Sequence, residues 1–417
     1  MDHVLGFKCS LCGQEYGLDE IEYVCPKHGD MGNVDVVYDF KKVAKKFGKR
    51  KLAENGDHSI WRYRALLPIE QDSPALPLQI GWTPLYRSEQ LRQFLKMPSV
   101  FIKDDGRNPT ASFKDRASSV AVVKARELKR EVITTASTGN AGAALAGMAA
   151  SVGQPAVIFA PETAPEAKVA QLLMFGAQVL LVKGNYDQAF DLCLQASREF
   201  GWYCRNTGYN PFTAEGKKTA ALEICEQLQW KAPDRIFVSV GDGNIISGIH
   251  KGLKDLHALG MIDKVPKLMG VQATGSAACA NAWRHHTEKI TPVSAQTIAD
   301  SISVDLPRDG VRAVRAVAHT GGAYITVSDD DILDAMRVLA RQAAVFSEPA
   351  GATAYAGLVK AIKSKLVERD ETIVVLITGN GLKDVRSAIR AAGQAMKIEP
   401  TLDAVKQLLQ RVGNKPD

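Results

Sequence analysis

Short apolar runs alternate with longer amphipathic stretches along most of the chain after residue 99. Short runs bounded by Gly, Pro or Asn predict buried strands, whereas longer stretches with apolar positions three or four residues apart predict helices. Strands are predicted at residues 99–103, 132–135, 155–160, 178–182, 235–240, 267–271 and 372–378. Helices are predicted at residues 114–129, 141–151, 166–175, 186–200, 215–229, 245–259, 329–344 and 352–363.

This alternation is typical of an α/β fold, because strands that alternate with helices of this length form parallel sheets with helices on both faces. Two runs of the pattern predict two open, mostly parallel α/β domains, a smaller one at residues 99–205 and a larger one at residues 206–417. Ligands are expected in the cleft between them, at the carboxyl ends of strands. Residues 41–98 are expected to be a linker and wrapping segment, and within it residues 57–98, which contain many prolines, are expected to wrap the surface in extended form.

The amino-acid composition mainly excludes other classes of protein. The chain has 417 residues, of which 46% are hydrophobic and 24% charged, as in ordinary globular proteins of more than one domain. No apolar run approaches the ~18 residues of a membrane span, and the N-terminus lacks the pattern of a secretory signal. The seven cysteines, an odd number, favour a reducing cytoplasm. The excess of Lys and Arg over Asp and Glu, 52 − 46 = 6, is a weak indication of nucleic-acid binding.

Residues 1–40 contain two pairs of metal-type ligands. Cys9 and Cys12 are separated by two residues, as are Cys25 and His28, and 12 residues lie between the pairs. Each pair forms a tight turn that presents two ligands to one tetrahedral ion, and four protein ligands leave no open coordination position. The spacing therefore predicts a zinc-ribbon-like module with a structural zinc ion. Two unrelated turns without a metal are the alternative.

Lys114 lies between a predicted strand and the helix predicted at residues 114–129. Ser112 and Asp115, three residues apart, match a helix capping box and place Lys114 in the first turn. A lysine there faces the positive end of the helix dipole, and partial burial would lower the pKa of its amine further. Such an amine is suited to Schiff-base chemistry. An exposed first-turn lysine is the alternative.

Three further loops follow predicted strands. Ser137-Thr138-Gly139-Asn140 opens a helix of small residues, and its hydroxyls and N–H groups form a cradle suited to a carboxylate. Gly241-Asp242-Gly243-Asn244-Ile245 opens another helix and is suited to a phosphate, because glycine permits close approach. Thr378 places a neutral hydroxyl at the end of a strand, where a simple helix cap is the alternative. Together with Lys114, these loops are a more specific indication of a functional site than any one of them alone.

With these motifs the chain resembles the threonine synthase family of fold-type II pyridoxal-phosphate enzymes. The resemblance extends from Trp61 to about residue 390, and the ribbon is a prefix also found in that family. Its most specific strings are Phe113-Lys114-Asp115-Arg116 and Gly379-Asn380-Gly381-Leu382-Lys383-Asp384, and a further string is Glu215-Gly216-Lys217-Lys218-Thr219. The resemblance implies two open α/β domains of the tryptophan-synthase-β-like kind, and a homodimer is expected because dimers are common in this class.

The resemblance also implies roles for the loop residues. Lys114 would bind pyridoxal 5′-phosphate covalently and then serve as general base, and residues 241–245 would hold the cofactor phosphate. Asn140 would hydrogen-bond the pyridoxal 3′-oxygen, and Thr378 would face the ring nitrogen. Ser137 and Thr138 would bind the substrate carboxylate. The implied substrate is a small phosphorylated amino acid, O-phospho-L-homoserine, which reacts with water to give L-threonine and phosphate.

Two positions depart from the family pattern. Ala141 stands where many members have Thr, and Thr213 stands where many have the Arg that contacts the substrate phosphate. An arginine fork is the natural phosphate ligand, and threonine is a weak replacement. The cations considered as replacements are Lys103, Arg107, Arg308 and Arg312.

Two other functions therefore stay open. The departures also fit a serine/threonine ammonia-lyase or a β-replacement enzyme with the same cofactor. The ribbon and the basic residues 41–51 also fit a nucleic-acid-binding protein with an inactive enzyme body. That second alternative is disfavoured, because it leaves the lysine and both cradles without a purpose.

Overall fold

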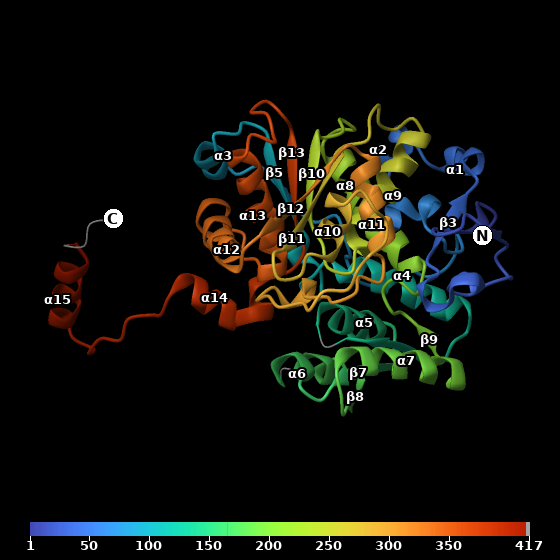
Figure 1. The fold of residues 1–417 in the computed structure, drawn as a ribbon, viewed down its shortest axis with the longest axis horizontal. Coiled ribbons are helices and arrows are strands. Elements are labelled where there is room, and N and C mark those ends of the chain that lie inside the picture. The colour runs from blue at the N-terminus through green and yellow to red at the C-terminus, as the bar shows by residue number, and fades with distance from the viewer. Residues whose placement is uncertain (138, 165, 414–417) are drawn as a thin grey trace.

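The structure is a computed structural model that describes residues 1–417 except 138, 165 and 414–417. Within those residues the strands form sheets of three, six and four strands. The three-stranded sheet belongs to the N-terminal module, and the two larger sheets form the body of the molecule (Figure 1). None of the helices in the described part of the chain has both the length and the apolar character of a membrane span.

The N-terminal module is an antiparallel sheet of order β2-β1-β3, formed by β1 (Val4–Cys9), β2 (Glu15–Tyr16) and β3 (Val34–Tyr38). Two short helices follow, α1 (Phe40–Lys46) and α2 (Lys49–Ala53). They bury Val43 and Leu52 against the body and expose their lysines. The basic residues 41–51 are therefore the solvated faces of two helices.

The six-stranded sheet has the order β12-β11-β10-β13-β5-β4 and is parallel except for β4. Its strands are β4 (Leu85–Tyr86), β5 (Val100–Asp104), β10 (Arg235–Ser239), β11 (Lys267–Ala273), β12 (Ala323–Val327) and β13 (Ile373–Ile377). The central strands β10 and β13 are buried at every position, as expected where helices cover both faces of a parallel sheet. Its helices are α3 (Glu89–Leu95), α8 (Phe212–Gln227), α9 (Asn244–Ala258), α10 (Ala278–Arg284), α11 (Gly310–His319), α12 (Asp329–Ala343), α13 (Pro349–Lys363) and α14 (Val385–Ala392).

The four-stranded sheet is parallel, with the order β8-β7-β6-β9. Its strands are β6 (Ile133–Ala136), β7 (Ala156–Pro161), β8 (Gln178–Val182) and β9 (Tyr203–Cys204), and its helices are α4 (Lys114–Glu127), α5 (Asn140–Ala150), α6 (Glu166–Met174) and α7 (Tyr186–Phe200). Helix α4 packs against α5 on one side and α8 on the other, so it joins the two sheets. The last helix, α15 (Leu402–Gly413), lies apart from the body (Figure 1).

The predicted architecture of parallel α/β sheets is confirmed, but two predictions about its parts are wrong. The strand expected to open the smaller domain, β5, pairs with β13 in the larger sheet, where Ile102 lies opposite Val375. Residues 57–98 do not simply wrap the surface, because the 3₁₀ helix Ile60–Leu66 is buried in the core. Its apolar side chains, with Ile69 and Ile80, outweigh the tendency of the prolines to stay outside.

Candidate active site

A cavity of about 460 Å³ lies at the carboxyl ends of β6, β10 and β13. Its wall contains Lys114, Ser137, Asn140, residues 241–245 and Thr378. The structure therefore brings together the residues that the sequence predicts for cofactor and substrate binding. Thr138, the other predicted carboxylate ligand, lies outside the described residues.

Backbone hydrogen bonds between distant segments hold the loop before Lys114. Phe113 N–H donates to the carbonyl of Thr378 at 2.9 Å, and Asn380 N–H donates to the carbonyl of Ala111 at 3.0 Å. Ala111 has a φ of 62°, which is unfavourable for a residue with a side chain. The loop after β13 thus holds the start of α4 in a strained but defined position.

The capping box predicted for this helix is not formed. The Asp115 carboxylate accepts a hydrogen bond from Thr110 N–H at 2.7 Å, on the loop that precedes the helix. The Ser112 hydroxyl accepts from Lys114 N–H at 3.4 Å. Lys114 is nevertheless the first residue of α4, as the sequence predicts. Asp115 therefore fixes the loop rather than the helix end.

Burial lowers the pKa of the Lys114 amine, the nearby Glu348 carboxylate opposes this shift, and Arg205 adds to it. The direction agrees with the sequence prediction, although burial is the main cause. Burial also raises the pKa of the Glu348 carboxyl, against the effect of Lys114. Asn140 Nδ2 donates to Glu348 Oε1 at 2.7 Å and to Ser301 Oγ at 3.3 Å. Glu348 and Ser301 therefore orient the Asn140 amide at the cavity wall.

The loop at residues 241–245 has the geometry of an anion site. Gly243 has a φ of 92°, and a Cβ there would lie 2.7 Å from the Asp309 carbonyl oxygen, so only glycine fits. Helix α9 begins at Asn244, and the free N–H groups of its first turn attract anions. These features fit the phosphate group of pyridoxal phosphate.

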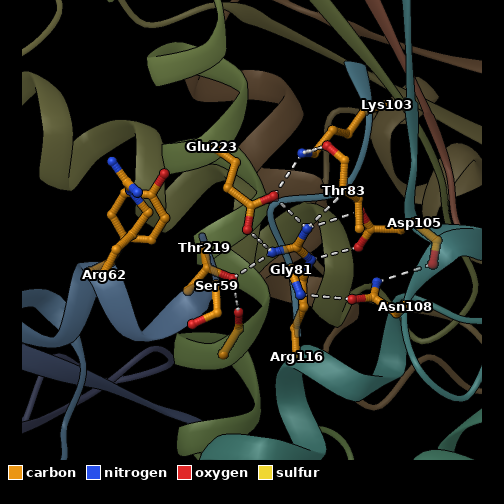
Figure 2. Close-up of polar contacts among 12 residues, drawn as sticks. Ser59, Arg62, Gly81, Thr83, Lys103, Asp105, Asn108, Arg116, Thr219 and Glu223 are labelled. Carbon is orange, nitrogen blue, oxygen red and sulfur yellow. Dashed lines mark hydrogen bonds and ion pairs between the residues drawn. The ribbon is translucent and has the colours of Figure 1, made fainter. Parts of the chain in front are cut away.

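A buried ionic cluster anchors α4 two residues beyond Lys114 (Figure 2). Arg116 Nε lies 2.6 Å from Asp105 Oδ2, and Arg116 Nη2 lies 2.8 Å from Glu223 Oε2. Lys103 Nζ binds the same Glu223 oxygen at 2.7 Å. Burial would raise the pKa of the Glu223 carboxyl, but Arg116 and Lys103 outweigh it and lower this pKa to about 2. The cluster connects β5, α4 and α8.

Among the described residues, none of the cations considered from sequence as replacements for the missing arginine is both unpaired and in the cavity wall. Lys103 is paired with Glu223, and Arg312 with Asp309 and Asp35. Arg107 is exposed and does not line the cavity. Arg308 lines the cavity, but its Nη2 lies 3.1 Å from Asp187 Oδ1.

Sequence reasoning missed two cations that do line the cavity, Arg205 and Lys217. Arg205 directly follows β9, and a polar residue after a strand is the signal that could have found it. Lys217 lies four residues after Thr213 on α8, hence on the same helix face.

The four predicted metal ligands come together in the N-terminal module. The ligand atoms of Cys9, Cys12, Cys25 and His28 all lie within 4.8 Å of one another, which fits a tetrahedral ion. The module also contacts the cavity region, because Asn33 Nδ2 donates to the Arg308 carbonyl at 2.7 Å.

Comparison with known proteins agrees with this geometry. A model of the family described as pyridoxal-phosphate dependent enzyme matches residues 76–379. Fold and site thus define a lyase that depends on this cofactor. Threonine synthase of Methanocaldococcus jannaschii is 39% identical over 407 residues, which cover 97% of this chain and 99% of that protein. Threonine synthase of Methanosarcina acetivorans is 38% identical over 404 residues, covering 96% and 98%. The chain belongs to the threonine synthase family.

Solved structures confirm the fold-type II architecture. Threonine deaminase isoform 2 from Solanum lycopersicum matches with a TM-score of 0.64 at 24% identity, covering 75% of this chain and 83% of that one. Maize serine racemase matches with a TM-score of 0.64 at 22% identity, covering 79% and 92%. At these identities the likeness shows the fold alone.

Proposed function

We propose that this chain converts O-phospho-L-homoserine and water to L-threonine and phosphate, with pyridoxal phosphate as cofactor. The proposal rests on one observation: a single cavity is lined by Lys114, the loop of Ser137 and Asn140, the glycine loop at residues 241–245, and Thr378. Each of these groups has the chemistry that one part of the cofactor or substrate requires.

The cofactor, when bound, supplies an electron sink that stabilises carbanions at the substrate carbons. In this proposal the Lys114 amine would hold the cofactor covalently. Its lowered pKa then suits it to remove and return protons at the substrate Cα, Cβ and Cγ.

Other residues bind and orient. The N–H groups of residues 241–245 and the first turn of α9 hold the cofactor phosphate. Asn140, fixed by Glu348, would hydrogen-bond the ring oxygen, and Thr378 would offer a neutral hydroxyl to the ring nitrogen. The Ser137 hydroxyl, beside the N-terminus of α5, holds the substrate carboxylate.

We also propose that Cys9, Cys12, Cys25 and His28 bind a structural zinc ion, because four protein ligands leave no position for substrate. A homodimer is the proposed assembly, to be checked by light scattering. A cytoplasmic location is proposed because none of the seven cysteines, all within the described residues, forms a disulfide.

The proposed function is tested by turnover and by labelling. The purified holoenzyme is expected to release phosphate from O-phosphohomoserine while threonine accumulates, and borohydride reduction is expected to fix the cofactor on Lys114. Lys114→Ala should lose at least about 10³-fold in kcat, a loss typical of a general base combined with covalent binding.

Lys124→Ala is the matched control, because Lys124 lies on the same helix but pairs with Glu127 away from the cavity. A coloured holoenzyme that releases no phosphate from O-phosphohomoserine would contradict the proposal. Formation of a keto acid from serine or threonine, without phosphate release, would assign the chain to the ammonia-lyases instead.

A further inference from the structure

Buried cations in this protein are almost always paired. Among the described residues, ten Lys or Arg side chains are buried: Arg62, Lys103, Arg116, Lys124, Arg205, Lys217, Lys218, Arg235, Lys251 and Arg312. Eight of them have a carboxylate oxygen within 4.0 Å. The two exceptions, Arg205 and Lys217, both line the active-site cavity. An unpaired buried charge is costly, so a charge from outside the chain is expected to compensate these two.

The Arg205 guanidinium is held by neutral groups only. Its Nη1 donates to Thr207 Oγ1 at 2.8 Å and its Nε to Ser118 Oγ at 3.2 Å. Its Nη2 is buried and has no hydrogen-bond partner among the residues that the structure describes. Because hydroxyl partners do not neutralise a charge, the guanidinium keeps both a free donor and its positive charge at the cavity wall.

Lys217 approaches the cavity from α8. Its Nζ donates to Asn244 Oδ1 at 2.6 Å, and the hydroxyl of Thr213, one turn earlier, lies 3.3 Å from the same oxygen. Burial, with the charges of Arg205 and Lys114, lowers the pKa of the Lys217 amine well below its ordinary value. Lys114, Arg205 and Lys217 all line this one cavity.

We propose that Arg205 and Lys217 form the subsite that binds the phosphate monoester of the substrate and the inorganic phosphate product. This inference rests on the proposed function and assigns the group that stands in for the arginine absent at position 213. A phosphate monoester is close to a dianion at neutral pH and matches two cations, one with a planar fork and one with a point charge. When the substrate Cγ–O bond breaks, its electron pair leaves with the phosphate oxygen, and the pair freed by removal of the Cβ proton forms the Cβ–Cγ double bond. The two cations stabilise the charge on the departing phosphate.

The cofactor also has a phosphate, so the experiment must distinguish loss of substrate-phosphate binding from loss of cofactor binding. Arg205→Gln and Lys217→Gln are made in the full chain and studied as holoenzymes in phosphate-free buffer. Each is expected to weaken the binding of inorganic phosphate, measured by titration calorimetry, by about tenfold to a hundredfold. The KM for O-phosphohomoserine should rise by a similar factor. The cofactor affinity of the apoprotein, measured by absorbance titration, should change less than about threefold.

Arg308→Gln is the charge-matched control, because Arg308 lines the same cavity but is paired with Asp187. Its phosphate affinity should stay within about threefold of wild type, which separates a specific subsite from a general positive field. Arg205→Lys keeps the charge but loses the planar guanidinium fork. Its phosphate affinity should fall by about tenfold, at the low end of the loss expected for Arg205→Gln.

Lys217→Met covers the case in which a glutamine variant fails to fold. Removing an unpaired buried charge should raise the melting temperature in phosphate-free buffer, while abolishing the further rise that added phosphate gives to the wild type. A lysine with only a structural role would shift the melting temperature in the opposite direction.

Two outcomes would overturn the subsite: a wild-type holoenzyme that does not bind inorganic phosphate, or glutamine variants that lose cofactor affinity but keep phosphate affinity. The second outcome would assign both cations to the cofactor. If phosphate binding depends on both residues but no threonine forms, the subsite stands and the proposed reaction fails.

Discussion

Gly216 lies where α8 packs against the beginning of α4. A Cβ at this position would be 2.1 Å from the carbonyl oxygen of Arg116, two residues after Lys114. No side chain can occupy that space, so only glycine lets the two helices approach as they do. This gives a packing reason for the glycine in the Glu215-Gly216-Lys217-Lys218-Thr219 string, which sequence alone linked to the family through resemblance.

We expect Gly216→Ala to destabilise the protein by about 3 kcal/mol, because the helices must separate to admit the methyl group. The holoenzyme should also lose cofactor more readily, since the first turn of α4 moves with Arg116. Denaturant unfolding followed by circular dichroism measures the first effect, and absorbance of the bound cofactor measures the second.

Gly56→Ala is the control for that substitution. Gly56 is exposed, and a Cβ there would meet no atom within 4 Å. Its free energy of unfolding should stay within about 0.5 kcal/mol of wild type. If Gly216→Ala unfolds at the wild-type denaturant concentration, the close approach has no energetic consequence and the packing argument is wrong.

Among the elements, β5, α4 and α8 are joined by the cluster of Arg116, Asp105, Glu223 and Lys103 (Figure 2). All four side chains are fully buried, and each acid faces at least one cation. Removing one member of such a cluster leaves an unpaired charge, so the cluster is expected to fix the three elements relative to one another.

The cluster makes an acid-dependent contribution to stability. The pKa of Glu223 in the folded protein, about 2, lies below its ordinary value of 4.5. The carboxylate therefore stabilises the fold fully above about pH 4.5, and this stability is lost as the pH falls toward 2. Urea unfolding between pH 7 and pH 2 should show the loss in the wild type and a flatter profile in Glu223→Gln.

At pH 7 the Glu223→Gln variant should be less stable than wild type by about 3–5 kcal/mol, because Lys103 and Arg116 lose their shared partner. Glu54→Gln is the control, since Glu54 forms an exposed pair with Arg50 and should matter little. An acid profile of Glu223→Gln that parallels the wild type would show that Glu223 is not the group that titrates.

Elements whose ends are marked by nearby capping or turn residues could be predicted from the sequence. The strand at residues 178–182 and the helix at residues 186–200 are observed with the predicted bounds. Between them Asn185 and Gln188 form a capping box, a signal contained in four residues. The sheet to which β5 belongs has no such local signal, because it depends on the insertion of β13, whose residues are far along the chain.

The residues of the candidate site also fall into those with a local sequence signal and those without one. The loops at residues 137–140 and 241–245 could be found because each follows a predicted strand and opens a helix. Glu348 has no such local signal, because its hydrogen bond to Asn140 spans 208 positions. Arg205 follows a strand of only two residues, too short for periodicity, and Lys217 lies on a helix that is buried on nearly all sides.

At the scale of the whole molecule, the N-terminal module is connected to the glycine loop through two side chains. Asn33 Nδ2 donates to Asp309 Oδ1 at 3.1 Å, and Asp309 Oδ2 accepts from Asn244 Nδ2 at 2.8 Å. Asn33 itself is held by Ser10 N–H, which donates to its carbonyl at 2.9 Å between Cys9 and Cys12. The metal-ligand loops therefore support the wall of the active site.

We expect Asn33→Ala to weaken cofactor binding by about threefold to tenfold, the equivalent of one hydrogen bond. Removal of zinc with a chelator should also weaken cofactor binding, since the loop between Cys9 and Cys12 holds Asn33. Metal analysis should find one zinc per chain before chelation, and absorbance titration measures the affinity for pyridoxal phosphate.

Asn281→Ala is the control for Asn33→Ala, because Asn281 is an exposed asparagine on α10. Its cofactor affinity should equal that of the wild type. An unchanged affinity in both Asn33→Ala and the chelated protein would show that the module and the active site are independent.

The strand order of the large sheet has a consequence for biosynthesis. β13 (Ile373–Ile377) lies between β5, which leads to Lys114, and β10, which leads to the glycine loop. Until those five residues leave the ribosome, both neighbouring strands have an unpaired edge, and such edges attract other chains. The growing polypeptide must therefore protect the open edge of β5 from residue 104 onward and also that of β10 from residue 239 onward, until β13 is made. It gains the capacity to retain its vitamin-derived cofactor only near the end.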